Sequence, residues 1–493
     1  MLQHTGGSRY VSRTEWGISV VHSFSFEAQE RFAKLSGDHN PIHMDPLVAR
    51  RLMYGRPVVH GIHVLLCALD RWLEEEGDPI HLTSLSVKFR SPTFLGEDAE
   101  FAVLPVSPNG VKIVVTANQV KLLTAAIAWE RQIGRGPDVP CESAPRTACR
   151  SRSVADLCTS SGQIPLCLDR SLACRLFPQV LERVPAEQVA VLLATSRLVG
   201  MEAPGLHSIF TGMELTASEN VGDPALAYRV EGYDERVFLL NLRVDAPGLS
   251  GSLTALVRPA PRAQATIAVL RGLVDSDEFQ HERALVIGGS RGLGEVAVKE
   301  LAVGGAQVKL TYHRGAHDAE RVKSEVISQG GAAQCFAYDV LTDAGELASR
   351  VGEWSPTILC YFATPFISAA IKGRFSRERF AELCEYYVRG FHDTFHAVSR
   401  LGNDLRYVLY PSSSMIDELP SSFAEYVAAK SAAETLCRLL EKSHPGVRIY
   451  SPRLPRLSTD QTASVLGGTR DAEEVVLAAL REMRTPNVTN RAV

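Results

Sequence analysis

Four absences narrow the class of this 493-residue chain before any motif is considered. No apolar run approaches the roughly 18 residues of a membrane span, so we expect no contact with a membrane. The 52 Lys and Arg residues almost balance the 56 Asp and Glu residues, which leaves a net charge of −4. Nucleic-acid binding usually needs a basic face, so we expect no nucleic-acid partner.

Close cysteine pairs and a secretory signal are missing too. The ten cysteines include no C-x-x-C, although zinc sites usually contain such pairs. We therefore expect free, mostly structural thiols and no metal. The N-terminal stretch MLQHTGGSRYVSRTEW lacks the apolar core of a signal peptide, which favours a cytoplasmic protein.

Changes in composition and residue pattern along the chain predict three domains, about the number expected from the length. The first covers residues 1–140 and ends in strand-like runs such as VKIVVTANQV. A linker rich in Pro, Ser and Arg, GRGPDVPCESAPRTACRSRS, begins at residue 134 and overlaps the end of this domain. The second domain covers residues 163–260. The third, 283–493, opens with the apolar strand ALVI and a group of glycines.

The first two domains share a pattern that indicates a distant internal repeat. Each contains a long apolar helix, HGIHVLLCALDRWLEEEG in one and QVAVLLATSRLVGMEAPG in the other. Each helix precedes a run of strand candidates, and the runs end alike in TAAIAWER and LTALVRPAP. A buried helix followed by antiparallel strands predicts a sheet wrapped around a helix. Coincidence between two α+β segments is the alternative.

The stretch LSGDHNPIHMDP contains a candidate acid–base pair. Asp38 and His43 flank Asn40-Pro41, and Pro41 forces Asn40 out of the helical region. The chain must turn there, so both side chains can enter one pocket. A carboxylate beside an imidazole can transfer protons near neutral pH. Gly61 begins an apolar helix, where a free N–H could stabilise an enolate-like oxyanion.

Two other interpretations of these residues remain. A metal could be bound by Asp38 with the neighbouring histidines, but Pro41 disrupts the helical i,i+4 spacing that zinc helices use. Alternatively, His60 and His63 could be satisfied core histidines, which we favour for His63. The second domain has no D-x-N-P-x-H stretch, so we expect it to be a scaffold without catalytic residues that helps to shape a tunnel.

The motifs S-G-D-x-N-P-x-H-x-D and G-x-P-V-x-H-G resemble those of the MaoC-like (R)-specific enoyl-CoA hydratases and dehydratases, over residues 24–96. The resemblance implies a hot-dog fold in which Asp38 and His43 are the catalytic dyad. Asn40 would hold the dyad, and Gly61 would supply the oxyanion N–H. The second domain would be the degenerate half of an α+β double hot-dog. The substrate would be an acyl thioester on coenzyme A or an acyl carrier protein.

The stretch ALVIGGSRGLGE predicts a nucleotide-binding turn between a strand and a helix. Its glycines permit close approach of the backbone, and a pyrophosphate could lie at the helix N-terminus. Far downstream, Tyr426 and Lys430 in YVAAK share one helix face. A nearby ammonium lowers the pKa of a phenol, so we expect Lys430 to make Tyr426 a proton donor to a carbonyl. A structural Tyr–Lys pair is the alternative.

These features resemble the short-chain dehydrogenase/reductases over about residues 283–460. The resemblance implies an α/β Rossmann-type, doubly wound parallel sheet and a homodimer. Ser413, thirteen residues before Tyr426, would polarise the carbonyl, and Lys430 would complete the catalytic set. The implied cofactor-binding residues are Gly288, Ser290, Arg291, Gly292, Leu293, Gly294, His313, Arg314, Asp339, Val340 and Ala363.

The expected cofactor is NADPH. An NAD enzyme usually has an acidic residue about 20 positions after the glycines, to bind the ribose hydroxyls. Here Tyr312, His313 and Arg314 stand at that place, and Arg291 lies in the glycine loop. Guanidinium groups suit a 2′-phosphate.

Three family features are altered. Tyr361-Phe362-Ala363-Thr364 replaces the usual Asn-Asn-Ala-Gly, Tyr387 replaces a helix asparagine, and Pro452-Arg453 replaces a Pro-Gly. We therefore consider three functions. The first is reduction of a 3-oxoacyl thioester followed by dehydration, in fatty-acid or polyketide-like biosynthesis. The second is the reverse sequence, hydration and NAD-dependent oxidation, as in β-oxidation. The third is a synthase subunit with one inactive half.

Overall fold

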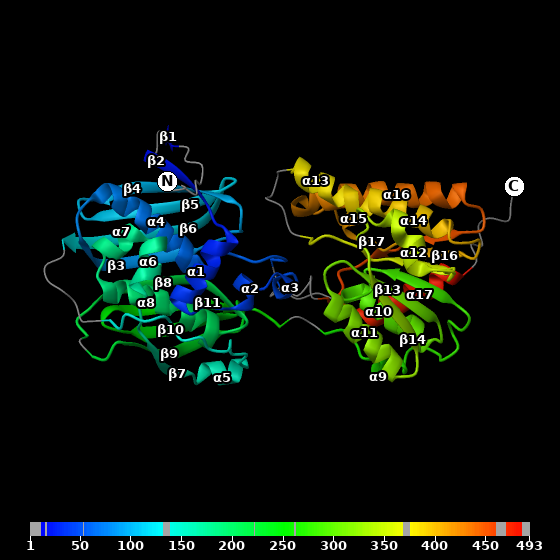
Figure 1. Ribbon diagram of the computed structural model, residues 1–493, viewed down its shortest axis with the longest axis horizontal. Coiled ribbons are helices and arrows are strands. Elements are labelled where there is room, and N and C mark those ends of the chain that lie inside the picture. Colours follow the sequence, from blue (N-terminus) through cyan, green and yellow to red (C-terminus); the bar gives the residue numbers. More distant parts are fainter. Residues whose placement is uncertain are drawn as a thin grey trace, which may run out of the picture. The chain divides into compact units, whose positions relative to one another are not determined.

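The computed structural model describes residues 11–14, 17–52, 54–131, 139–220, 222–260, 263–367, 375–459 and 470–485. Parts of the N-terminal stretch, in which we expected no signal peptide, and parts of the expected linker lie outside these ranges. The chain divides into two compact units, Met1–Ala260 and Pro261–Val493 (Figure 1).

The N-terminal unit contains one antiparallel sheet of eleven strands in the order β1-β2-β4-β5-β6-β3-β8-β11-β10-β9-β7. The strands are β1 (Val11–Thr14), β2 (Gly17–Ser23), β3 (Ile80–Phe89), β4 (Asp98–Ser107), β5 (Gly110–Ala117), β6 (Val120–Arg131), β7 (Ser161–Pro165), β8 (Ser208–Ser218), β9 (Ala225–Asp234), β10 (Leu239–Asp245) and β11 (Gly248–Val257).

The strand order repeats in the two halves of this sheet. Residues 17–131 give β2-β4-β5-β6-β3, and residues 161–257 give β7-β9-β10-β11-β8. In each half the strand that follows the long helix lies at the centre. These two central strands, β3 and β8, pair antiparallel with Leu85 opposite Leu215. The two halves therefore form one continuous sheet around a common centre.

Two long helices, α4 (Gly61–Glu76) and α8 (Ala186–Arg197), pack with the sheet in one hydrophobic core. Nearly every residue in the first three turns of α4 is buried, which explains its continuous apolar sequence. α8 continues into a π-helical turn, η1 (Leu198–Glu202). The shorter helices are α1 (Phe26–Ser36), α2 (Pro41–Met44), α3 (Pro46–Ala49), α5 (Val154–Cys158), α6 (Arg170–Leu176) and α7 (Pro178–Arg183).

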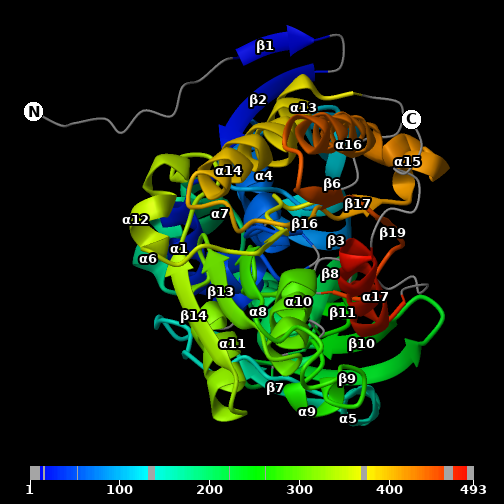
Figure 2. The same cartoon turned by 90° about the vertical axis from the view of Figure 1, so that its right-hand side faces the viewer.

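The C-terminal unit has a six-stranded parallel sheet in the order β14-β13-β12-β15-β16-β18. Three of its strands, β13, β14 and β16, are labelled in Figure 2. The six strands are β12 (Arg283–Ile287), β13 (Gln307–Tyr312), β14 (Ala332–Ala337), β15 (Ile358–Tyr361), β16 (Tyr407–Leu409) and β18 (Arg448–Tyr450). The first strand of the unit lies inside the sheet and the order reverses beside it, as in doubly wound folds. The expected Rossmann-type fold is thereby confirmed.

Helices cover both faces of this parallel sheet. Ala284 and Val286 of β12 pack on one side, and Leu285 and Ile287 pack on the other, because side chains alternate along a strand. The first side is covered by α10 (Gly292–Val303), α11 (Ala316–Ser328) and α17 (Ala472–Arg484), and the second by α12 (Leu347–Val351), α14 (Phe391–Ser399) and α16 (Ala424–Ser443).

The remaining elements of the unit are short. They are α9 (Ile267–Leu270), η2 (Ala344–Glu346), α13 (Arg377–Cys384), the π-helical η3 (Glu385–Gly390), β17 (Ser412–Ser413), α15 (Met415–Glu418), η4 (Ser421–Phe423) and β19 (Arg453–Leu454). All ten cysteines of the chain are free, as expected. Within the described ranges, no helix combines the length and the apolar character needed to cross a membrane.

Candidate functional sites

The loop between α1 and α2 places Asp38 in the interior. α1 ends at Ser36, and the following Gly37, with a φ of +77°, turns the chain inward. Asn40 has the extended conformation that the following Pro41 requires, with φ −54° and ψ 129°. Its side chain accepts the Ile42 N–H at 3.0 Å and so caps α2. Asp38, only 2% exposed, is thus held between two helix ends.

Three titratable groups meet at this loop. The carboxylate of Asp38 and the imidazoles of His43 and His60 each offer an atom within 4.8 Å of the others. The rings of His43 and His60 stack with their centroids 3.8 Å apart. His43 Nδ1 lies 2.8 Å from the Val58 carbonyl oxygen. A carbonyl only accepts, so Nδ1 bears the proton in neutral His43 and Nε2 is left with a lone pair.

Burial brings the pKa values of Asp38 and His43, the two members of the expected dyad, closer together. Desolvation raises the pKa of Asp38, although His43 and a hydrogen bond from Ser196 oppose this effect. Desolvation lowers the pKa of His43, with Asp38 as the main opposing influence. A narrower gap between the two pKa values suits a pair that must both give and take protons.

The same three groups could in principle bind a metal ion. The disrupted helical spacing at Pro41 does not keep these groups apart as we expected it to, because tertiary packing brings Asp38, His43 and His60 together from separate elements. A different observation bears on the metal interpretation. His60 Nε2 lies 2.9 Å from the backbone oxygen of Asp38, so that nitrogen bears a proton and offers no lone pair.

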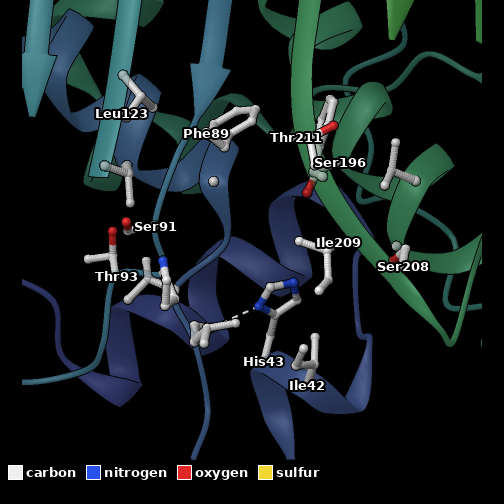
Figure 3. A pocket seen from close by; sticks show the side chains of 18 of the residues that line it. Ile42, His43, Phe89, Ser91, Thr93, Leu123, Ser196, Ser208, Ile209 and Thr211 are labelled. Atoms are coloured by element: carbon white, nitrogen blue, oxygen red, sulfur yellow. Dashed lines mark hydrogen bonds between the residues drawn. The ribbon is translucent and has the colours of Figure 1, made fainter. Parts of the chain in front are cut away.

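A pocket of about 270 Å³ opens beside the dyad. In Figure 3 the His43 ring projects into it, with Phe89 and Leu123 from the first half and Ile209 and Thr211 from the second. Gly61 lines the pocket at the first position of α4, where the N–H has no intrahelical acceptor. The Phe89 ring lies so close that a Cβ on Gly61 would come within 2.7 Å of it.

The second half of the sheet contributes directly to this site, which the sequence analysis missed. Ser196 of α8 donates a hydrogen bond of 2.7 Å to Asp38 Oδ2. A Cβ on Gly200 would overlap the Asp38 carboxylate. Asn40 Nδ2 donates to the carbonyls of Gly200, at 2.8 Å, and Gly205, at 3.1 Å. The half that we expected to be a scaffold shaping a tunnel therefore also forms hydrogen bonds with Asp38 and Asn40.

A sequence signal for Ser196 did exist. The helix AVLLATSRLV is apolar except for Thr195-Ser196 and Arg197, and all three of these residues are buried. Buried polar groups usually have hydrogen-bonding partners, so a polar pair in a core helix predicts a polar neighbour. Which neighbour this would be depends on tertiary structure.

In the C-terminal unit, the turn between β12 and α10 has the expected tight geometry. Gly288 has a φ of +76°, and a Cβ there would come within 3.0 Å of the Ala363 nitrogen. A Cβ on Gly294 would overlap the Gly288 carbonyl oxygen. The Thr311 hydroxyl accepts the Gly288 N–H at 3.0 Å. α10 begins without a side-chain cap, so its first N–H groups fit a phosphate.

Four of the other expected cofactor positions belong to this turn or to the helix that follows it. Ser290 is buried in the turn, and Arg291 is the residue that precedes α10. Gly292 and Leu293 form the beginning of that helix. All four therefore lie where a pyrophosphate at the helix start would be bound.

The remaining expected positions follow β13 and β14. His313 lies just after β13, and its Nε2 is 3.3 Å from Oδ2 of Asp339. The imidazole of His313 and the carboxylate of Asp339 are thus brought together. Arg314 is exposed beyond the end of β13, whereas Val340 is buried in the core.

The expected Ser–Tyr–Lys set is assembled on β17 and α16. The side chains of Ser413 and Tyr426 are hydrogen-bonded to each other. Lys430 Nζ donates to the Pro411 carbonyl at 2.7 Å. Burial lowers the pKa of Lys430 to about 7, although Cys437 and Glu434 oppose the shift.

One expectation about this set was wrong. We expected Lys430 to lower the pKa of Tyr426, but burial raises the pKa of Tyr426, and the hydrogen bond with Ser413 is what opposes the rise. The physical reason is that Tyr426 loses its hydration in the core, whereas the Lys430 ammonium is directed to the Pro411 carbonyl.

Similar proteins were found for both units. Residues 17–125 match the family described as "MaoC like domain", so the chain carries a MaoC-like dehydratase domain near its N-terminus. The (R)-specific enoyl-CoA hydratase of Aeromonas caviae is 39% identical over 71 residues, which are 14% of this chain and 51% of the relative. The 3-hydroxyacyl-thioester dehydratase Y of Mycobacterium tuberculosis is 32% identical over 86 residues, 17% of this chain and 30% of the relative.

The C-terminal unit is similar to short-chain dehydrogenase/reductases. The short chain dehydrogenase/reductase dmxR18 of Cryptosporiopsis is 27% identical over 163 residues, 32% of this chain and 62% of the relative. A solved 3-oxoacyl (acyl-carrier-protein) reductase from Agrobacterium tumefaciens with NADP bound has 21% identity and a TM-score of 0.37, covering 42% of this chain and 88% of that one. The chain spans less than two thirds of the length of each of these curated relatives.

Proposed function

We propose that the chain is a bifunctional acyl-thioester enzyme of fatty-acid or polyketide-like biosynthesis. One unit would reduce a 3-oxoacyl thioester to the (R)-3-hydroxyacyl thioester with NADPH. The other would eliminate water to give the trans-2-enoyl thioester, carried on coenzyme A or an acyl carrier protein. The observation that carries the proposal is the presence, in one chain, of a buried acid–base pocket and a Ser–Tyr–Lys set in a Rossmann-type unit.

In the dehydratase, the hydrogen bonds support the following roles. The Val58 carbonyl accepts the His43 Nδ1–H, so Nε2 of His43 is free to act as the base. It would take a proton from the carbon atom next to the thioester carbonyl. Asp38, whose pKa is raised by burial, would protonate the leaving hydroxyl. The Gly61 N–H would bind the thioester oxygen as negative charge develops on it. Asn40 holds the loop against the second half through the Gly200 carbonyl.

In the reductase, the cofactor would supply hydride to the 3-oxo carbon. Tyr426 would donate a proton to the carbonyl oxygen, and Ser413 would position that oxygen. The glycine turn and the uncapped start of α10 fit a pyrophosphate. We assign the 2′-phosphate to Arg291 and Arg314, because guanidinium groups bind phosphates in a forked geometry.

We also propose that residues 163–260 form a degenerate second hot-dog repeat, so that residues 1–140 and 163–260 make a double hot-dog before the reductase domain at 283–493. The repeated strand order supports this assignment. The central pairing of β3 with β8 does so too, since it lets the two repeats share one sheet. By its contact with Asp38, Ser196 gives the second repeat a part in the site.

The test follows nicotinamide absorbance in the full chain with short 3-oxoacyl thioesters, on coenzyme A and on carrier protein, with mass analysis of the products. NADPH should be oxidised faster than NADH, and Arg314→Asp should reverse or reduce this preference. With Asp38→Asn blocking elimination, the 3-hydroxyacyl intermediate should accumulate as the R enantiomer on a chiral column. An S product, or no reduction of any 3-oxoacyl thioester, would overturn the coupled function.

A further inference from the structure

The ammonium of Lys430 lies in an aromatic enclosure. Nζ is 4.2 Å from the centre of the Tyr387 ring and 4.7 Å from the centre of the Tyr410 ring. Its one hydrogen bond in the described part of the chain is the one to the Pro411 carbonyl. Lys430 is 8% exposed, so the two ring faces replace much of the water that would otherwise solvate its charge.

Tyr387 is fixed firmly enough to hold this position. Its hydroxyl forms a hydrogen bond of 2.6 Å with the Thr364 hydroxyl, and its carbonyl accepts the Tyr410 hydroxyl at 3.1 Å. Tyr387 belongs to the π-helical η3, and the preceding carbonyl, of Tyr386, accepts the Tyr361 hydroxyl at 2.6 Å. A π-turn leaves backbone groups without regular partners, and two tyrosine hydroxyls satisfy them here.

The same ring also contacts the proposed proton donor. The Tyr387 and Tyr426 rings are 5.7 Å apart and nearly perpendicular, at 77°. One side chain thus presents its face to Lys430 and packs with Tyr426. Both of these residues belong to the proposed reductase set, whereas Tyr387 stands where the resemblance to the short-chain dehydrogenase/reductases implies an asparagine.

We propose that Tyr387 is a positioning residue of the reductase site, which keeps Lys430 protonated beside Tyr426 through the face of its ring. Its effect on turnover rests on the proposed reductase function, but its effect on the charge of Lys430 does not. The role belongs to the ring, while the hydroxyl only anchors the ring to Thr364.

The charge balance around Lys430 makes this role measurable. Desolvation favours the neutral amine, and few groups oppose it. The titratable groups that face Lys430 or act on its charge are Tyr387 of η3, Tyr410 after β16, and Glu434 and Cys437 of α16. Tyr426 lies one turn before Lys430 on the same helix. Glu434 is committed to hydrogen bonds with Ser412 and Arg453. Losing a buried cation–π contact should therefore lower the titration midpoint of Lys430 by about one pH unit.

The experiment compares Tyr387→Leu, which fills the space without a π face, with Tyr387→Phe, which keeps the face and loses only the hydroxyl. Phe395→Leu is the matched control, because Phe395 is fully buried on α14 and its ring contacts Phe391, His396 and His444 rather than Lys430. Two readouts are taken on the full chain. One is the titration of Lys430 by NMR of ¹⁵Nζ-labelled lysine, assigned by the loss of its signal in Lys430→Arg. The other is the pH profile of NADPH oxidation.

Tyr387→Leu should move the Lys430 midpoint, and the alkaline limb of the activity profile, to lower pH, whereas Tyr387→Phe and Phe395→Leu should leave the midpoint unchanged. The same midpoint in Tyr387→Leu as in the parent would overturn the proposal. A shift of equal size in Tyr387→Phe would also overturn it, since the hydroxyl would then be responsible. If no variant or parent oxidises NADPH, the proposed reductase function fails, while the NMR titration still decides the role of Tyr387.

Discussion

The two halves of the N-terminal unit have the same strand order but different surroundings at the start of the long helix. In the first half, α4 begins at Gly61 and borders the pocket. In the second, the start of α8 is filled by Gln188, whose side chain accepts the Leu82 N–H and donates to the Leu82 carbonyl, both at 2.9 Å. One helix start can therefore receive a ligand, whereas the other is occupied by the protein itself.

The halves also differ in what they give to the acid–base site. The first supplies the loop with Asp38 and His43, and the second supplies Ser196 and the close backbone of Gly200. Neither half holds a complete environment for the Asp38 carboxylate. The comparison teaches that a half without an acid–base pair of its own can still take part in the site, because its helix contacts the Asp38 carboxylate of the other half.

The largest effect is expected from the dyad itself. Asp38→Asn and His43→Ala should each reduce dehydration by about a thousandfold, because each removes a proton-transfer group. Formation of the enoyl thioester from the 3-hydroxyacyl thioester measures this step. Reduction by the C-terminal unit should remain at the parent rate, which serves as the internal control. If either variant dehydrates the substrate at the parent rate, the assignment of the dehydratase site to Asp38 and His43 is wrong.

A smaller but still large effect is expected at Gly200 in the second half. Gly200→Ala would place a methyl group against the Asp38 carboxylate and displace it. A displacement of this kind should reduce kcat for dehydration by about a hundredfold. Gly232→Ala in β9 is the matched control, because no heavy atom lies within 4 Å of its added Cβ. Equal activities in the two alanine variants would mean that the second half is only a scaffold.

Ser196→Ala should have a moderate effect that depends on pH. The hydrogen bond from Ser196 lowers the pKa of Asp38, so its removal should raise that pKa further. In the hydration direction Asp38 acts as the base and must be ionised, so hydration activity should fall at acidic pH. In Ser196→Ala the acidic limb of the pH–activity profile should therefore move to higher pH. A charge-assisted hydrogen bond corresponds to about one pH unit and about tenfold in rate. Ser196→Thr, which keeps the hydroxyl, should restore the profile, and an unmoved limb in Ser196→Ala would contradict the assignment.

Much of this architecture could be predicted from the sequence because it depends on local patterns. The extended conformation of Asn40 follows from Pro41, and the tight turn at Gly288 follows from its lack of a side chain. The parallel sheet of the C-terminal unit follows from alternating strands and helices. In each case a few neighbouring residues determine the conformation.

The rest could not be predicted because it depends on contacts between distant segments. Ser196 and Asp38 are 158 residues apart, so no local pattern links them. The approach of His60 to the dyad is likewise a tertiary contact. The rise in the pKa of Tyr426 was not predicted, because the sequence shows the spacing between Tyr426 and Lys430 but not the burial of both groups.

The smallest effect is expected where the two halves are joined away from the pocket. Asp70 of α4, in the first half, accepts the N–H groups of Gln179 and Val180 at 2.7 and 2.9 Å and so caps α7 in the second half. The residue before α7, Phe177, provides no side-chain cap of its own. Asp70→Ala should therefore reduce the free energy of unfolding by about 1–2 kcal/mol, the usual cost of losing a helix cap.

Dehydration at saturating substrate should be unchanged in Asp70→Ala, because the cap lies outside the pocket lining. Urea unfolding followed by circular dichroism measures the stability, and Asp70→Asn, which keeps an acceptor oxygen, should lose less. Glu74→Ala on the same helix is the control, since Glu74 forms an exposed ion pair with Arg71, which contributes little. If Asp70→Ala is as stable as Glu74→Ala, the two halves are held together by the shared sheet and core alone, and the long-range cap adds nothing to their association.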